Sequence, residues 1–103
     1  MSNFGNQEED RGNTFAEDTG FELPPDRKVV FYNDDYTTMD FVVDVLVSIF
    51  NKSRDEAEAL MTAVHETGSS VVGVYTFDLA VSRANLTKQI ARKKGFPLRV
   101  EVE

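Results

Sequence analysis

A short polar run in the first half of the chain carries side chains suited to binding a cation. Asn33, Asp34 and Asp35 follow an apolar stretch and precede an apolar helical pattern. Their amide carbonyl and carboxylate oxygens accept hydrogen bonds. This polar corner can therefore hold a positively charged group beside an apolar wall. The alternative is an ordinary turn from a strand to a helix, because the same side chains bond readily to nearby backbone.

His65, the single histidine of the chain, supplies a further acceptor when its ring is neutral. Helical spacing places Met61, Val64 and His65 on one side of a predicted helix. Met39 and Val42 form a comparable apolar strip on the helix before it. If the two helices are neighbours, these apolar side chains line one hollow and the histidine stands at its rim, facing the polar corner. The alternative is that they belong to the core and that the histidine is a hydrogen-bonded surface residue.

A primary ammonium group fits such a set of acceptors, because it has three donors and no acceptor. A free protein N-terminus with a large apolar first side chain matches both the acceptors and the apolar wall. Burial of a Phe or Leu side chain contributes about 1.5–3 kcal/mol. Each charge-assisted hydrogen bond adds about 1.5–3 kcal/mol. After the cost of association, the sequence is consistent with micromolar affinity.

Two other kinds of site fit these residues less well. Zinc and calcium sites need more ligands than two carboxylates and one distant histidine. A hydrolase triad could be drawn from Asp34, His65 and a serine, but no serine lies in a nucleophile elbow. Glycine-rich phosphate loops are absent from the sequence. We therefore expect no metal, no cofactor and no enzymatic activity.

Composition excludes several classes of partner. The net charge of −7 and the pI near 4.6 argue against a nucleic-acid partner, which needs a basic face. The chain has no cysteine, so disulfides and zinc–thiolate sites are excluded. No apolar run approaches the length that spans a bilayer, and the N-terminus lacks the pattern of a signal peptide. We expect a cytoplasmic protein with no membrane partner.

The charge is concentrated at the beginning of the chain. Residues 1–26 contain seven acids and one base, which gives −6, whereas the remainder carries −1. Residues 1–24 show neither helical nor strand periodicity and are predicted to be a disordered acidic tail. The Pro24-Pro25 pair marks its boundary with a single domain, residues 25–103.

The hydrophobic pattern predicts three strands and three helices in the domain. Thr37 is expected to cap the first helix, and Ser53 with Glu56 forms a capping box at the second, which Gly68 ends. The order β-α-α-β-α-β predicts an α+β fold, a two-layer sandwich of a three-stranded antiparallel sheet with three helices on one face. The elements are expected at residues 27–32, 38–51, 53–68, 70–75, 77–94 and 98–102.

Three segments of the sequence closely resemble the ClpS family, the bacterial adaptor of the Clp protease. They are residues 33–42, 60–68 and 73–76, and the resemblance as a whole covers residues 25–103. The resemblance implies an adaptor for N-degrons, substrates whose first residue is Leu, Phe, Tyr or Trp. Such an adaptor delivers substrates to the N-terminal domain of the unfoldase ClpA, or ClpC in some lineages, for degradation by ClpP. It also implies a monomer whose tail is engaged by the unfoldase.

The resemblance also implies roles for individual residues. The substrate's α-amino group would be bound by Asn33, Asp35 and His65, with Asp34 in the same corner. Met39 would be the gatekeeper that rejects β-branched first residues. The side-chain pocket would be lined or bordered by Thr37, Met39, Val42, Met61, Val64 and Leu98, and the unfoldase contact would include Asp78 and Arg83.

One departure and one rival family need consideration. Thr38 stands where many ClpS proteins have proline, and we expect little effect because both residues suit a helix start. The same element order also resembles the C-terminal domain of the bacterial ribosomal stalk protein. Fold alone therefore does not separate an adaptor from a helix-presenting interaction domain without a pocket. The polar corner paired with His65 favours the adaptor, because a docking module has no need of it.

Overall fold

The structure of the protein is a computed structural model that describes residues 26–103. The predicted acidic tail, residues 1–24, and its boundary at Pro24-Pro25 lie outside the described residues.

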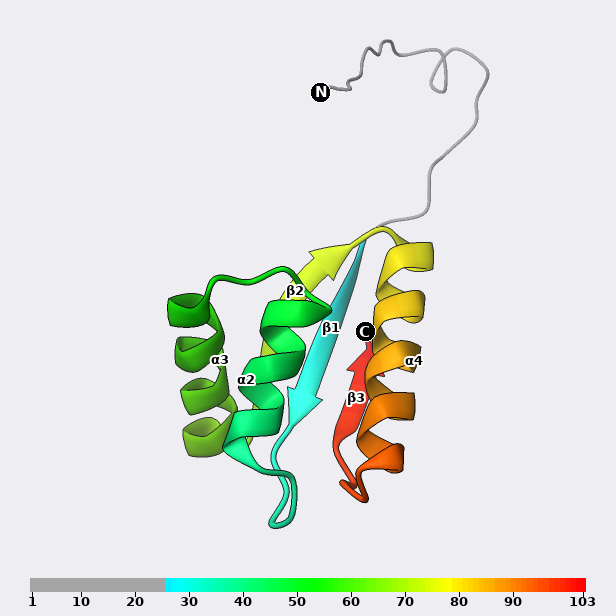
Figure 1. The fold of residues 1–103 in the computed structure, drawn as a ribbon. Helices are drawn as coiled ribbons and strands as arrows, with labels where there is room; N and C mark the ends of the chain where they lie inside the picture. Colours follow the sequence, from blue (N-terminus) through cyan, green and yellow to red (C-terminus); the bar gives the residue numbers. More distant parts are fainter. Residues whose placement is uncertain (1–25) are drawn as a thin grey trace, which may run out of the picture.

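Three strands and three helices follow one another in the predicted order β-α-α-β-α-β (Figure 1). Apolar residues follow one another in the first two strands, alternate with charged residues in the last, and recur at helical spacing in the helices, so each element has apolar side chains to bury. The elements are β1 (Arg27–Tyr32), α2 (Met39–Ser48), α3 (Arg54–Thr67), β2 (Ser69–Tyr75), α4 (Phe77–Lys93) and β3 (Arg99–Val102).

The three strands form one antiparallel sheet in the order β2-β1-β3, so β1 is central. The helix α4 packs against all three strands, α3 packs against β2, and α2 packs against α3. Figure 1 shows the helices on the near side of the sheet, with α3 beside α2. The predicted two-layer α+β sandwich is therefore confirmed.

The core lies between the sheet and the helices. Val29 and Phe31 of β1 are fully buried, and the ring of Phe31 meets the ring of Phe50 edge-on at 5.5 Å. The helix α2 buries five of its ten residues, which explains why its sequence is apolar on more than one side: Phe41, Val42, Val43, Val45 and Leu46. Such a helix stays in place through packing rather than through propensity.

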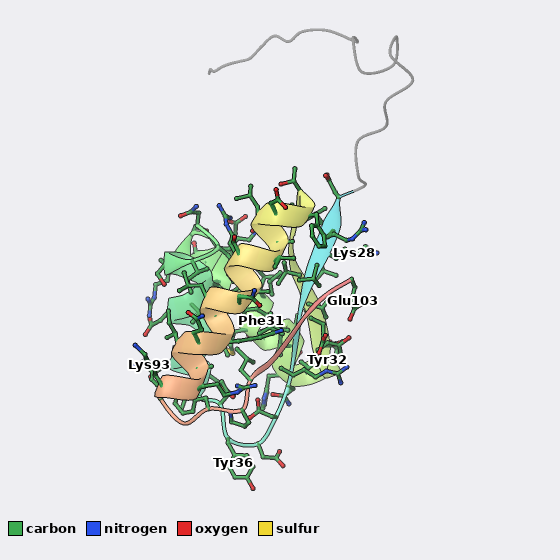
Figure 2. The ribbon with its side chains drawn as sticks, turned by 90° about the vertical axis from the view of Figure 1, so that its right-hand side faces the viewer. Lys28, Phe31, Tyr32, Tyr36, Lys93 and Glu103 are labelled. Carbon is green, nitrogen blue, oxygen red and sulfur yellow. The ribbon has the colours of Figure 1, made fainter. Side chains whose placement is uncertain are left out.

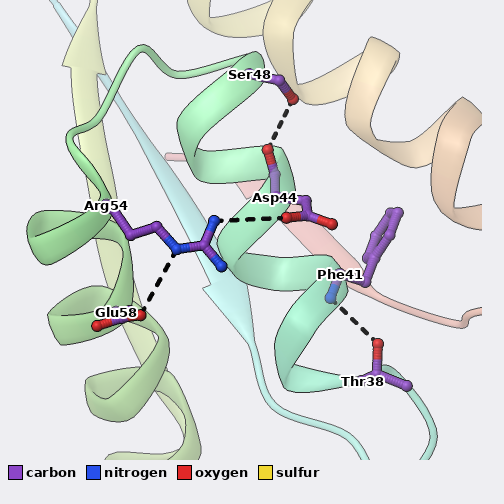
Figure 3. Close-up of polar contacts among 6 residues, drawn as sticks. All are labelled: Thr38, Phe41, Asp44, Ser48, Arg54 and Glu58. Atoms are coloured by element: carbon purple, nitrogen blue, oxygen red, sulfur yellow. Dashed lines mark hydrogen bonds and ion pairs between the residues drawn. The ribbon is translucent and has the colours of Figure 1, made fainter.

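The start of α2 differs by one residue from the expected cap. Thr38, not Thr37, is the N-cap, and its hydroxyl accepts a hydrogen bond from the N–H of Phe41 at 3.2 Å (Figure 3). The hydroxyl of Thr37 instead donates to Asp34. Both threonines can cap a helix, so the choice depends on the partner that the preceding loop offers to each.

The end of α2 also comes earlier than expected. The helix ends at Ser48 rather than at residue 51, and Asn51 adopts a left-handed conformation with φ of 56°. Asparagine tolerates this conformation better than most residues. The chain therefore turns toward α3 immediately after the helix.

The helix α3 begins and ends as predicted. Ser53 and Glu56 form a complete capping box, and Gly68 closes the helix with φ of 95°. Arg54 in its first turn lies 4.0 Å from Asp44 of α2 and 3.7 Å from Glu58 of α3 (Figure 3). All three side chains are exposed, so these ion pairs contribute only about 0–1 kcal/mol each. Packing of the apolar sides therefore holds the two helices together.

Candidate functional site

The pairing of β1 with β2 brings the polar corner next to the end of α3. Tyr32 at the end of β1 is opposite Ser69, the first residue of β2. The next residue along the chain, Asn33, donates its backbone N–H to the carbonyl of Gly68 at 2.9 Å. Because Gly68 closes α3, this bond holds Asn33 beside the last turn of the helix that carries His65. Residues separated by more than thirty positions in the sequence thus share one end of the molecule.

Asp34 shapes the loop between β1 and α2. Its Oδ1 accepts the backbone N–H groups of Tyr36 and Thr37 at 2.8 and 2.7 Å, and its Oδ2 accepts the hydroxyl of Thr37 at 2.8 Å. Partial burial alone would raise the pKa of this carboxyl. The hydrogen bonds from Thr37 and Tyr36, with the positive charge of Arg92, outweigh burial and lower the pKa of Asp34 below its usual value. The loop is therefore held by an ionised carboxylate.

A lowered pKa in the folded protein makes stability depend on pH. The contribution of Asp34 is present above the pKa of an unfolded aspartate, about 3.9, and is lost as pH falls through the lower folded value. We expect Asp34→Asn to flatten the loss of unfolding free energy in denaturant titrations below about pH 4. The control is Asp35→Asn, which removes the same charge from the same loop without removing these bonds. An equal flattening in both variants would contradict this account.

The polar corner and the facing sides of α2 and α3 enclose a hollow of about 390 Å³. Its lining combines a polar rim from the loop and α3 with an apolar wall from the two helices. The hollow is lined by Asn33, Asp34, Asp35, Tyr36, Thr37, Thr38, Met39, Val42, Met61, Val64 and His65.

Three acceptors at the rim are not used by the fold. Asn33, Asp35 and His65 are exposed. The hydrogen bonds and ion pairs found among residues 26–103 do not involve their side chains. Asp34 differs, because both of its oxygens are already occupied within the loop. The rim therefore offers an amide oxygen, one carboxylate and one ring nitrogen to a ligand.

The wall below the rim is apolar, and its side chains range from buried to exposed. Val42 and Val64 are buried, with 6% and 4% of their surface exposed, and Met61 is partly buried. Met39, at the start of α2, is 47% exposed and lies at the mouth. A flexible thioether chain at this point can narrow the entrance to the hollow.

The remaining residues singled out from the sequence lie elsewhere. Leu98 is 1% exposed and belongs to the core, and it does not line the hollow. Its carbonyl accepts a hydrogen bond from Arg92 at 3.3 Å. Asp78 and Arg83 lie on α4, where the guanidinium of Arg83 covers the ring of Tyr75 at 4.7 Å.

Tyr36 and Thr38 also line the hollow, although no site role was assigned to them from the sequence. Their position in the sequence could have indicated this, because the other residues from Asn33 to Met39 were all predicted to belong to the site.

Within residues 26–103, no group of three or more His, Cys, Asp or Glu side chains could hold a metal ion. None of the helices that the structure describes is long and apolar enough to cross a membrane.

Comparison with known proteins gives consistent matches across the domain. Residues 22–101 match the family model of the ATP-dependent Clp protease adaptor protein ClpS. The Clp protease adapter protein ClpS of Treponema denticola is 49% identical over 80 residues, which are 78% of this chain and 79% of that protein. The ClpS of Acetivibrio thermocellus is 46% identical over 83 residues, covering 81% and 84%.

A solved structure extends the match to three dimensions. Agrobacterium tumefaciens ClpS2, bound to L-phenylalaninamide, superposes with a TM-score of 0.75 at 38% sequence identity. The match covers 78% of this chain and 96% of that one.

Proposed function

The chain belongs to the ClpS family of adaptor proteins of the ATP-dependent Clp protease, and from this premise we propose that it binds substrates by their first residue. The preferred first residues are Leu, Phe, Tyr and Trp. The bound substrate is handed to a Clp unfoldase, ClpA or ClpC, for degradation by ClpP. The protein itself catalyses no reaction.

The observation that carries this proposal is the combination of free acceptors with an apolar wall in one hollow. Asn33, Asp35 and a neutral His65 can each turn an acceptor toward a ligand: an amide oxygen, a carboxylate and a ring nitrogen. An α-ammonium group has three donors and no acceptor, so it matches this set. The related ClpS2 is bound to L-phenylalaninamide, a molecule with a free α-amino group and an aromatic side chain. A ligand of that shape places its charge at the rim and its ring against Val42 and Val64.

The proposed roles follow the unused hydrogen-bonding groups. Asn33, Asp35 and His65 bind the α-amino group directly. Asp34 holds the loop through its bonds to Tyr36 and Thr37 and adds negative charge to the corner without touching the ligand. The pocket for the first side chain is formed by Thr37, Met39, Val42, Met61 and Val64. Leu98 does not line it and belongs to the same core cluster as Val42 and Val64.

The proposed unfoldase contact lies at the other end of the molecule. Asp78 is in the first turn of α4, between Phe77 and Leu79, each 47% exposed. Figure 1 shows the start of α4 at the opposite end from the loop between β1 and α2. We therefore propose that a contact through Asp78 and Arg83 leaves the hollow open, so that substrate and unfoldase bind together. In addition to this contact, the unfoldase engages the acidic segment of residues 1–24 during delivery.

A panel of free-amine peptides that differ only in their first residue tests this proposal. Peptides beginning with Leu, Phe, Tyr or Trp should bind about 10–100-fold more tightly than one beginning with Gly, because only the former bury a large apolar side chain. Fluorescence anisotropy measures the affinities. If the Gly peptide binds as tightly as the Phe peptide, the hollow does not recognise the first side chain.

A further inference from the structure

Tyr36 is a large aromatic side chain that does not pack into the folded domain. It is 74% exposed, the highest value among the large hydrophobic side chains of residues 26–103. Figure 2 shows it at the tip of the loop that follows β1, projecting from the body of the molecule. It takes part in none of the ring–ring or cation–ring contacts within residues 26–103, whereas Tyr32 and Tyr75 both do. Single exposed aromatics are common on protein surfaces, but Tyr36 lines the hollow together with the exposed Met39, so its ring is available to a ligand bound there.

The backbone that carries Tyr36 is nevertheless held in a defined conformation. Its N–H and the N–H of Thr37 both donate to the same oxygen of Asp34, at 2.8 and 2.7 Å. Thr38 then caps α2, so the loop is fixed at the following residues as well. Holding the backbone lowers the entropy cost of using the ring as a contact surface. The ring is therefore presented at the rim of the hollow, which Tyr36 helps to line.

The position of the ligand decides what this ring can touch. If the α-amino group sits at Asn33, Asp35 and His65, the first side chain occupies the hollow below them. The second Cα atom is about 3.8 Å from the first, so the second residue must lie at the mouth, where the loop surrounds the exit. Tyr36 and Met39 are the exposed apolar groups of the lining at this mouth.

We propose that Tyr36 contacts the second residue of the substrate and favours an apolar or aromatic side chain there. This inference rests on the proposed function and adds a preference to it. Partial burial of a Leu side chain against the ring is expected to strengthen binding about 3–10-fold compared with Gly at the second position. The preference at the second position should not depend on the first residue, because different parts of the site contact the two side chains.

The test compares two labelled peptides, one beginning Phe-Leu and one beginning Phe-Gly, by fluorescence anisotropy on the full chain. The wild type should prefer Phe-Leu by about 3–10-fold, and Tyr36→Ala should reduce this ratio to nearly one. Tyr36→Phe keeps the ring and should keep the ratio. Leu86→Ala is the matched control, because Leu86 is 46% exposed on α4 and does not line the hollow.

The outcomes separate this inference from the proposed function. If the wild type binds Phe-Gly and Phe-Leu equally, or if Tyr36→Ala keeps the ratio, the role of Tyr36 is wrong while the recognition of the first residue stands. If neither peptide binds the wild type, both proposals fail. Thermal melting of Tyr36→Ala should match the wild type, because so exposed a side chain contributes little to stability.

Discussion

Asp35→Asn should weaken the binding of a Phe-started peptide about 10–100-fold, because it replaces the carboxylate that pairs with the α-ammonium group by a neutral and weaker acceptor. The side chain of Asp35 is exposed, and no hydrogen bond or ion pair found in the described residues uses it. The free energy of unfolding should therefore stay within about 0.5 kcal/mol of the wild type. Isothermal titration calorimetry and urea unfolding measure the two quantities on the same preparation.

The neighbouring substitution Asp34→Asn is the charge-matched control. It removes one negative charge from the same loop, but the two oxygens of Asp34 already accept bonds from Tyr36 and Thr37. We expect it to lower stability more than Asp35→Asn does and to weaken peptide binding less. An equal loss of affinity in both variants would mean that the loop attracts the ammonium by its overall charge, and that Asp35 makes no specific contact.

Met39→Ala should allow peptides that begin with Val or Ile to bind. Met39 stands at the mouth of the hollow with 47% of its surface exposed, and Val42 lies further along the same helix. Branching at Cβ widens the first side chain close to the backbone, so a bulky neighbour at the entrance excludes it by steric overlap. Truncation to Ala should raise the affinity for a Val-started peptide by about 10-fold and change the affinity for a Phe-started peptide much less.

Competition of unlabelled Val- and Phe-started peptides against a labelled Phe peptide gives the ratio of their two affinities directly. Leu86→Ala serves again as the control, since Leu86 is equally exposed but lies outside the hollow. A ratio unchanged from the wild type would remove the gatekeeper role from Met39.

The element order and the juxtaposition of the polar corner with His65 could be predicted from the sequence. Helical spacing fixes which of Met61, Val64 and His65 share a side, and a strand pair fixes which ends meet. The capping box at Ser53 is a local signal, because all of its partners lie within four residues. Features of this kind depend on residues that are close in the sequence or regularly spaced, so they can be predicted without knowledge of tertiary contacts.

Other features depend on contacts that the sequence does not state. Asp34 and Asp35 are chemically identical, and only the geometry of the loop shows that one is occupied and the other free. Thr37 and Thr38 are equally suitable N-caps by residue type. The hydroxyl of Thr37 is bonded to Asp34, and Thr38 is the residue that caps the helix. Leu98 precedes β3 in an alternating pattern that does not show how close it lies to the hollow.

The most direct measurement is a comparison of one labelled Phe-started peptide with the same peptide acetylated at its N-terminus, by fluorescence anisotropy. Acetylation removes the positive charge and two of the three donors and leaves the aromatic side chain intact. The account predicts saturable binding of the free amine in the micromolar range and a loss of at least about 100-fold on acetylation. Equal binding of the two peptides would show that Asn33, Asp35 and His65 do not recognise an α-amino group.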